Sequence, residues 1–340
     1  MKIALITDTW LPEVNGVVVT LRHLTAELSA LGHEIQLLTP DTFSTIQCPG
    51  FNTVRLALFP QRGVTRILDE WQPATIHIAT EGPLGLAARH YCLKRRLSFT
   101  TSYHTRFPEY LRTRAPVPLK LSYAWLRRFH QPAARVLVST STLVRHLASH
   151  GFCNLTVWGK GVDTELFRPH DKNRISDPRP VWMYAGRVAA EKNLEAYLSL
   201  DLPGTKYVVG DGPELVSLRK RYPQARYTGF LLGQDLARQL ATADVFVFPS
   251  LTDTFGLVLL EALACGVPVA AYPVMGPADV VNQGVTGYCH GDLQQAALAC
   301  LSLNPEHCRA QALRQGWHQV AAQFVAHMVP ARPVADRLAG

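Results

Sequence analysis

The chain has 340 residues, of which 47% are apolar and 18% charged, a globular balance with enough length for two domains. It contains no apolar run of ~18 residues and no Cys-x-x-Cys pair among its seven cysteines, which argues against a membrane-spanning helix, a zinc site and a disulfide framework. The net charge of +8 comes from residues 1–170, with 19 Lys and Arg against 11 Asp and Glu, which indicates an acidic partner or merely a solvated basic surface.

The first half of the chain alternates short apolar runs with helical patterns. The run Ile3–Ile6 predicts a buried strand and, because Asp8 follows so soon, no secretory signal, which together with the unpaired cysteines predicts a cytoplasmic protein. A helix follows over residues 17–31, and Gly32 supplies its stop. Further strands are expected at residues 33–40, 74–80, 97–104 and 134–140.

The second half repeats the pattern after a stretch rich in proline and charge. Strands are expected at residues 181–186, 206–212, 225–230, 244–250 and 267–273, with helices between them and one helix over 305–328. We therefore predict an α/β protein with two Rossmann-like, doubly wound parallel-sheet domains that face a central cleft. The expected bounds are 1–168 for the first domain, 169–180 for a linker, 181–316 for the second domain and 317–340 for a C-terminal helix, which has the option of crossing back to the first domain.

The strongest candidate site lies in residues 249–271, where Asp253 and Glu261 are separated by seven residues. The carboxylate of Glu261 sits on an apolar helix and needs a partner, which the two hydroxyls of a ribose would supply; a private salt bridge is the alternative. Asp253 would then reach the sugar end of the same ligand, because eight helical positions span at most ~12 Å. The helix start offers free N–H groups to ligand oxygens and is formed by Phe255, Gly256 and Leu257.

This segment resembles the acidic-x7-acidic motif of the retaining glycosyltransferases of family four, although the family usually has Glu where this chain has Asp253. The run Thr252–Gly256 is similar to a subgroup that contains bacterial α-mannosyltransferases and sulfolipid-synthase-like enzymes. The resemblance implies the two-domain GT-B fold. It also implies retention, which gives an α-linked product.

Two more segments of the second half resemble the same family. Tyr184–Lys192 is similar to its G-R-x3-E-K loop, which implies that Arg187 and Lys192 bind the donor diphosphate; surface cations paired with Glu191 are the alternative. Fixed cations stabilise the charge that builds on a departing nucleoside diphosphate. The family's loops near the nucleotide and its base match Gly210, Gly212, Gly229 and Phe230.

In the first domain the resemblance is looser. Pro12–Gly16 resembles the family's glycine loop, in which Asn15 and Gly16 would tolerate unusual dihedrals close to the phosphate. His104, at a strand's carboxyl end, resembles the histidine that contacts the donor sugar near the reacting carbon. Tyr103 and Glu81 are expected on the acceptor side; for Glu81, a helix cap is the alternative.

The predicted reaction is transfer of a hexose from a UDP- or GDP-linked donor to a hydroxyl of a glycolipid, lipid-linked or glycan acceptor. The sequence holds no Asp-x-Asp pair, so we expect no metal and no further cofactor. We find no protein nucleophile and expect same-face attack, in which the leaving phosphate oxygen takes the acceptor's proton. A nucleotide-sugar epimerase and a non-catalytic nucleotide-sugar-binding protein are the alternatives.

The partner predictions rest on charge and its pattern. Residues 118–129 mix cations with apolar and aromatic residues, which is typical of a helix on the cytoplasmic face of an anionic membrane or of an ordinary amphipathic helix packed in the core. The apolar and aromatic residues are Leu119, Tyr123, Trp125, Leu126 and Phe129. No aromatic-basic motif for nucleic acid occurs, so none is expected as a partner.

Overall fold

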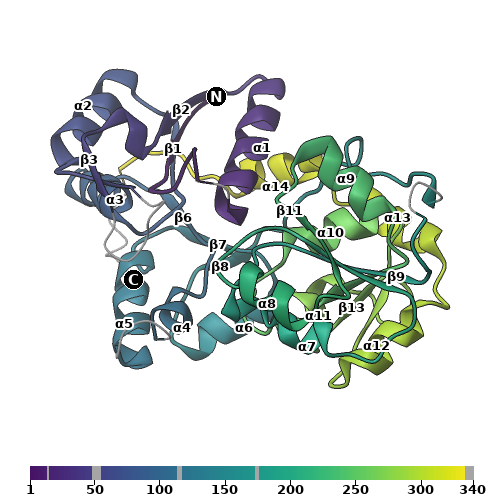
Figure 1. The fold of residues 1–340 in the computed structure, drawn as a ribbon. Coiled ribbons are helices and arrows are strands. Elements are labelled where there is room, and N and C mark those ends of the chain that lie inside the picture. Colours follow the sequence, from purple (N-terminus) through teal and green to yellow (C-terminus); the bar gives the residue numbers. More distant parts are fainter. Residues whose placement is uncertain (14, 48–54, 113–116, 173–175, 334–340) are drawn as a thin grey trace. The chain divides into compact units, whose positions relative to one another are not determined.

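The computed structural model describes residues 1–13, 15–47, 55–112, 117–172 and 176–333. These residues divide into two compact units (Figure 1). The first comprises Met1–Gly159 and the chain from Trp317 onward, and the second comprises Lys160–Gly316. Within this part of the chain, none of the helices combines the length and the apolar composition needed to cross a bilayer.

The first unit contains a parallel sheet of six strands in the order β2-β1-β5-β6-β7-β8. Its strands are β1 (Lys2–Ile6), β2 (Glu34–Leu38), β5 (Thr75–Ile78), β6 (Thr100–Tyr103), β7 (Arg135–Val138) and β8 (Leu155–Val157), with a small hairpin of β3 (Thr45–Gln47) and β4 (Arg55–Ala57). Its helices are α1 (Gly16–Ala30), α2 (Gln61–Trp71), α3 (Pro83–Lys94), α4 (Phe107–Arg112), α5 (Leu119–His130), α6 (Ser141–Ser149) and α14 (Trp317–His327). Helix α1 connects β1 to β2 and helix α3 connects β5 to β6, so the two connections run in opposite directions across the sheet. Because crossovers between parallel strands are right-handed, the two helices cover opposite faces of the sheet.

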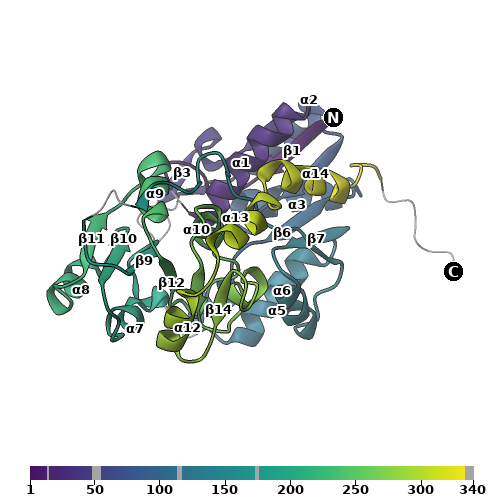
Figure 2. The same ribbon diagram turned by 90° about the vertical axis from the view of Figure 1, so that its right-hand side faces the viewer.

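The last helix of the described chain, α14, belongs to the first unit. It lies beside α1 in both views (Figures 1 and 2), where the rings of His23 and Trp317 stack at 5.0 Å. The indole N–H of Trp158 donates to the carbonyl of Val320 at 3.1 Å, and Phe324 is fully buried against His77. Burial of these aromatic side chains fixes α14 on the sheet.

The second unit contains a parallel sheet in the order β11-β10-β9-β12-β13-β14. Its strands are β9 (Val181–Ala185), β10 (Thr205–Val209), β11 (Arg226–Gly229), β12 (Val245–Phe248), β13 (Val269–Ala271) and β14 (Gly287–Cys289). Its helices are α7 (Leu194–Leu198), α8 (Leu215–Arg221), α9 (Gly233–Ala241), α10 (Leu257–Ala264), α11 (Pro277–Val280), α12 (Leu293–Cys300) and α13 (Pro305–Leu313).

Strand β9 shows why the strands read as continuous apolar runs. Its alternate residues enter two separate cores: Val181, Met183 and Ala185 pack with α9, α10 and α13, whereas Trp182 and Tyr184 pack with α7, α8 and α12. A strand that is buried on both faces has no solvent side on which polar residues could alternate. Both units are therefore parallel sheets with helices on both faces, which confirms the prediction of two doubly wound domains.

The division of the chain differs from the expected bounds at residues 160–168. These residues lie in the second unit, where the guanidinium of Arg309 donates to the carbonyls of Thr164 and Phe167 at 2.9 and 2.7 Å, and the N–H of Val162 donates to the carbonyl of Gln315. The same guanidinium donates to the carbonyl of Ala264 at 2.9 Å, so it joins this segment to the end of α10.

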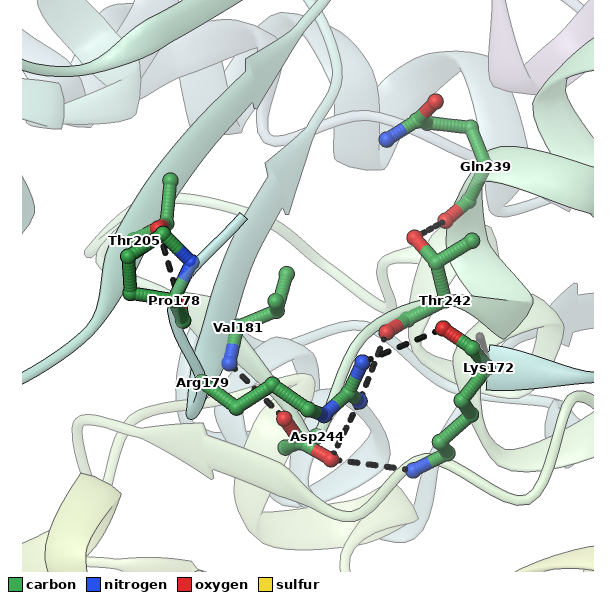
Figure 3. A network of polar contacts seen from close by, with 8 residues as sticks. All are labelled: Lys172, Pro178, Arg179, Val181, Thr205, Gln239, Thr242 and Asp244. Carbon is green, nitrogen blue, oxygen red and sulfur yellow. Dashed lines mark hydrogen bonds and ion pairs between the residues drawn. The ribbon is translucent and has the colours of Figure 1, made fainter. Parts of the chain in front are cut away.

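The expected linker, residues 169–180, also packs on the second unit where it is described. Figure 3 shows Lys172, Arg179 and the backbone N–H of Val181 directed at the carboxylate of Asp244, with donor distances of 3.3, 2.6 and 2.8 Å. Arg179 also donates to the carbonyl of Thr242. Burial raises the pKa of Asp244, but these donors outweigh it and hold the pKa below its ordinary value. Residues 173–175 lie outside the described residues.

The single helix expected over residues 305–328 is two helices. Helix α13 ends at Leu313 and α14 begins at Trp317, and the chain changes units at Gly316. Glycine weakens a helix interior by about 1 kcal/mol, and here the two halves bury their apolar sides in different cores. Residues 334–340, the end of the expected C-terminal helix, lie outside the described residues.

Candidate active site

The topology of each sheet predicts where a ligand binds. In the second unit the chain leaves β9 toward β10 on one side and leaves β12 toward β13 on the other, so the switch point lies between β9 and β12. In the first unit the switch point lies between β1 and β5. Ligands of open parallel sheets bind at the carboxyl ends of the strands at such a point.

The loops that follow β9 and β12 are joined by hydrogen bonds. The hydroxyls of Ser250 and Thr252 lie 3.4 Å from the carbonyl of Glu191 and donate to it, and the amide of Asn193 donates to the carbonyl of Pro249 at 3.2 Å. Asn193 has a φ of 56°, a left-handed conformation that asparagine tolerates better than most residues. The two loops therefore form one surface at the switch point.

This surface carries three of the predicted charged side chains, Arg187, Lys192 and Asp253. The ammonium of Lys192 lies 2.6 and 2.8 Å from the two carboxylate oxygens of Asp253, and both side chains are about one-fifth exposed. Arg187 is 54% exposed, and its nearest carboxylate oxygen, on Glu191, lies 3.7 Å away. Of the two cations for which pairing with Glu191 was the alternative, Arg187 forms only a long ion pair with it. Lys192 pairs with Asp253 instead. A cation and a carboxylate in contact can bind a diphosphate and a sugar hydroxyl side by side.

Glu261 lies on the second turn of α10, between the buried residues Leu260 and Ala262. Burial raises the pKa of Glu261 to about 7. Among the residues that the structure describes, no hydrogen bond or ion pair reaches its carboxylate, so the private salt bridge that was the alternative for this residue is not formed. A half-buried carboxylate without a partner is a candidate for a ligand contact.

The start of α10 follows a glycine in the left-handed conformation. Gly256 has a φ of 82°, and a side chain there would press on Leu259 and Phe248 at 3.1 and 3.2 Å. Phe255 is buried beneath it, and Leu257 begins the helix. In this first turn the N–H of Leu259 donates to the carbonyl of Gly256 at 3.0 Å; the contacts of Phe255, Gly256 and Leu257 with a donor stay predictions.

The glycines of the loop after β10 have a packing role. A Cβ on Gly210 would lie 1.9 Å from the carbonyl oxygen of Gly186, and one on Gly212 would lie 2.2 Å from that of Val188. The loop thus runs directly against the loop that carries Arg187. Gly229 has a φ of 78° with open space around it, and the Phe230 side chain that follows is 57% exposed. Contacts of all these residues with a nucleotide stay predictions.

At the switch point of the first unit, Asn15 does not adopt the unusual dihedrals that we expected. Its φ of −143° and ψ of 171° are extended, and its side-chain oxygen caps α1 by accepting from the N–H groups of Val17 and Val18 at 3.0 Å. Gly16 is the first residue of that helix. Asparagine is favoured here because it is a good N-cap, not because it tolerates left-handed backbone. Residue 14 lies outside the described residues.

Asp8 is a residue of this edge whose role the sequence reasoning missed. Its carboxylate accepts from the hydroxyl of Thr80 at 2.7 Å and from the N–H of Leu84 at 2.7 Å, so it caps α3 across the sheet. The helix cap proposed as an alternative for Glu81 is therefore wrong, and Glu81 instead contacts Nε2 of the buried His130 at 3.2 Å. The signal was a carboxylate directly after an apolar strand.

His104 follows β6, and its ring meets the indole of Trp158 edge-on at 6.2 Å. Tyr103 is 1% exposed, and its phenol oxygen has no hydrogen-bond partner within the described residues. No cluster of three or more His, Cys, Asp or Glu side chains able to hold a metal ion occurs in the described ranges. The thiols of the six cysteines in these ranges are free, and Cys48 lies outside them.

Similarity to known proteins extends over both units. The family model described as "Glycosyltransferase Family 4" matches residues 14–166, and the one described as "Glycosyl transferases group 1" matches residues 179–304. A GDP-mannose-dependent alpha-mannosyltransferase of Mycolicibacterium smegmatis is 32% identical over 317 residues, which are 84% of each chain.

Two further similarities cover most of the chain. An alpha-monoglucosyldiacylglycerol synthase of Streptococcus pneumoniae is 27% identical over 90% of this chain and 79% of its own. The solved structure of the sucrose-phosphate synthase of Thermosynechococcus elongatus superposes with a TM-score of 0.76 at 20% identity, over 95% of this chain and 97% of its own, and so has the same fold.

Proposed function

This chain belongs to glycosyltransferase family four and is a retaining glycosyltransferase with a nucleotide-sugar donor, and on that premise we propose that it transfers mannose from GDP-mannose to a hydroxyl of a membrane lipid. The observation that carries the proposal is the Lys192–Asp253 ion pair at the switch point of the second unit, beside the exposed guanidinium of Arg187.

The four charged groups of this site fit the two ends of such a donor. Arg187 and Lys192 would bind the diphosphate, whose negative charge grows as the sugar leaves, and preorganised cations stabilise that charge without reorganisation. Asp253, held by Lys192, would accept from sugar hydroxyls, and Glu261 would accept from the ribose. His104 would support the sugar as positive charge develops on its ring. The leaving phosphate oxygen then takes the proton of the acceptor hydroxyl, which attacks from the same face.

Mannose and guanine are proposed because the relative with 32% identity is named as GDP-mannose-dependent. We expect GDP-mannose at 100 times its Kd to stabilise the protein by about 2.7 kcal/mol and to raise its Tm by several degrees, because a ligand that binds only the folded state shifts unfolding by mass action. Thermal unfolding with GDP-mannose, UDP-glucose and ADP-glucose measures this. Stabilisation by a UDP-sugar alone would replace the proposed donor, and turnover of donor without acceptor to an epimer would replace the reaction.

The proposed acceptor side is the surface of α3 and α5. Helix α5 packs in the core on one side and exposes apolar side chains to the surface on the other. Tyr123, Leu126 and Phe129 are buried, whereas Leu121 and Trp125 are 64% and 45% exposed. The guanidinium of Arg89 on α3 donates to the carbonyls of Arg128 and Phe129 at 2.8 and 2.9 Å and so ties the helices together. On α3, Leu86 and Leu93 are also exposed.

The same two helices also carry cations. They are Lys94 and Arg96 near the end of α3 and Lys120, Arg127 and Arg128 on α5. Exposed Leu and Trp within a basic surface are typical of peripheral binding to anionic lipid at the headgroup level. We therefore propose that the protein works at the cytoplasmic face of a membrane; a lipid acceptor agrees with the name of the diacylglycerol-glucosylating relative.

Replacing both Leu121 and Trp125 with serine is expected to weaken binding to vesicles of anionic lipid by at least about ten-fold, because two exposed apolar side chains no longer enter the interface. Co-sedimentation at low salt measures this. The matched control is the replacement of Leu301 and Leu313 with serine, which are 43% and 50% exposed in the second unit. Equal loss in both variants, or no binding of the unmodified protein, would contradict the lipid surface.

A further inference from the structure

Three buried polar atoms close to the end of β6 have no hydrogen-bond partner within the described residues. They are the phenol oxygen of Tyr103, Nε of Arg106 and the carboxylate oxygen Oε2 of Glu109. An unsatisfied buried polar atom costs about 1–3 kcal/mol, so three together in a stretch of seven residues need an explanation. We call the side chains around them, Tyr103, Arg106, Glu109, Tyr123 and His146, the Tyr103 cluster.

The cluster is built so that one oxygen of Glu109 is used and the other is not. Oε1 accepts from Nη2 of Arg106 at 2.7 Å and from the hydroxyl of Tyr123 at 2.6 Å, and that hydroxyl lies 2.8 Å from Nε2 of His146. Burial raises the pKa of Glu109, but these donors outweigh it and lower the pKa below its ordinary value. The carboxylate is therefore ionised at neutral pH, with Oε2 available as an acceptor.

Tyr103 lies within the electrostatic reach of the same group. Its ring is held by Phe152, which it meets edge-on at 6.1 Å, and the charges of Glu109, Glu81 and Arg106 act on its phenol. Burial raises its pKa far above the usual range, so the phenol stays protonated and can donate. Tyr103 immediately precedes His104, at the carboxyl edge of the sheet where ligands bind.

The open atoms thus comprise two donors, on Tyr103 and Arg106, and one acceptor, on Glu109. A hydroxyl both donates and accepts, so it can satisfy the phenol and the carboxylate together, whereas an anionic group would meet the charge of Glu109. We infer that the Tyr103 cluster is an acceptor subsite that binds a neutral hydroxyl, of the kind carried by a sugar or glycerol headgroup. The inference rests on the proposed function for its acceptor class. It adds that this part of the acceptor is uncharged.

Side-chain exposures agree with a ligand of small size. Arg106, Glu109 and His146 remain 22%, 22% and 25% exposed, so the cluster reaches the surface while its open atoms lie inside. A single buried water is the competing occupant, since it also donates and accepts. If an acceptor hydroxyl occupies the cluster, removing the Tyr103 hydroxyl weakens the affinity for the acceptor; if a water occupies it, that affinity does not change.

The test is Tyr103→Phe, which removes only the unpartnered hydroxyl. We expect its Kd for octyl α-mannoside, measured by calorimetry, to rise about ten-fold, because one hydrogen bond of about 1.4 kcal/mol is lost. The Tm should not fall, since no protein hydrogen bond is removed. Tyr91→Phe is the matched control, because its hydroxyl bonds to Asp69 at 2.9 Å, away from the cluster. It should leave the Kd unchanged.

A second variant tests the acceptor atom. Glu109→Gln should also raise the Kd for octyl α-mannoside about ten-fold, and both variants should discriminate less against a deoxy-mannoside that lacks the recognised hydroxyl. Unchanged affinity in Tyr103→Phe, or failure of the unmodified protein to bind any of the neutral glycosides, would overturn the subsite. Because binding is read without turnover, a protein that binds the glycoside through Tyr103 but never transfers sugar to it would refute the proposed function alone.

Discussion

Lys192→Met is expected to lower kcat for sugar transfer by about 10³-fold. The substitution removes a preorganised cation from the leaving diphosphate, and loss of one such group typically costs 10²–10³ in kcat. It also leaves the carboxylate of Asp253, which Lys192 contacts at 2.6 Å, unpaired beside a negatively charged donor. The two losses act on the same ligand, so the effect should reach the upper end of that range.

The measurement is initial-rate kinetics with saturating donor. Arg221→Met is the matched control, since Arg221 pairs with Glu195 at 2.7 Å on the surface of the same unit, and its kcat should stay within about two-fold of the unmodified protein. Asp253→Asn should also be nearly inactive. The double variant should lose little more than either single one, because residues that act as a unit are not additive. A Lys192→Met enzyme with normal kcat would refute the assignment of this pair.

Glu261→Gln is expected to weaken donor binding by about 10²-fold at pH 8 and, at the same pH, to stabilise the ligand-free protein by about 2 kcal/mol. The pKa of Glu261 is raised by burial to about 7, against an ordinary value of 4.5. Folding therefore favours its protonated form, so this group's contribution to stability is greatest below pH 4.5 and declines as the pH rises to about 7. Glutamine, which is neutral throughout, avoids that decline.

Donor binding should show the opposite dependence on pH. Ribose hydroxyls donate to an ionised carboxylate, so the affinity of the unmodified protein should fall as the pH drops below about 7, and that of Glu261→Gln should not change. Urea unfolding and donor titration at pH 5.5 and 8 measure both effects. Glu195→Gln, on the surface of the same unit, is the control for loss of a carboxylate and should change neither. Equal donor affinity of Glu261→Gln and the unmodified protein would remove Glu261 from the site.

The sequence was sufficient for the parts of the fold that depend on local pattern. Continuous apolar strands and the loops at their carboxyl ends predict two parallel sheets and place Arg187, Lys192 and Asp253 at one edge. Their pairing was not predictable, because Lys192 meets Asp253 only when the loops after β9 and β12 are joined through Glu191 and Asn193.

Long-range capping and packing explain the other differences. The cap that Asp8 gives to α3 joins residues far apart in the chain, and only the tertiary fold brings them together. The division at Lys160 depends on Arg309, whose guanidinium reaches three carbonyls. Asn15 shows a different limit, since the same residue type suits both an N-cap and a left-handed turn, and the sequence alone does not decide between them.

The return of α14 to the first unit makes the second unit an insertion within the first. During synthesis, residues 160–316 are made before α14, which brings the buried Phe324 and the Val320 carbonyl that accepts from Trp158 to the first unit. All the strands and helices of the second unit therefore precede α14 in the chain, whereas the first unit can complete its core only with α14. A chain that ends at Gly316 should therefore keep a folded second unit and have a destabilised first unit.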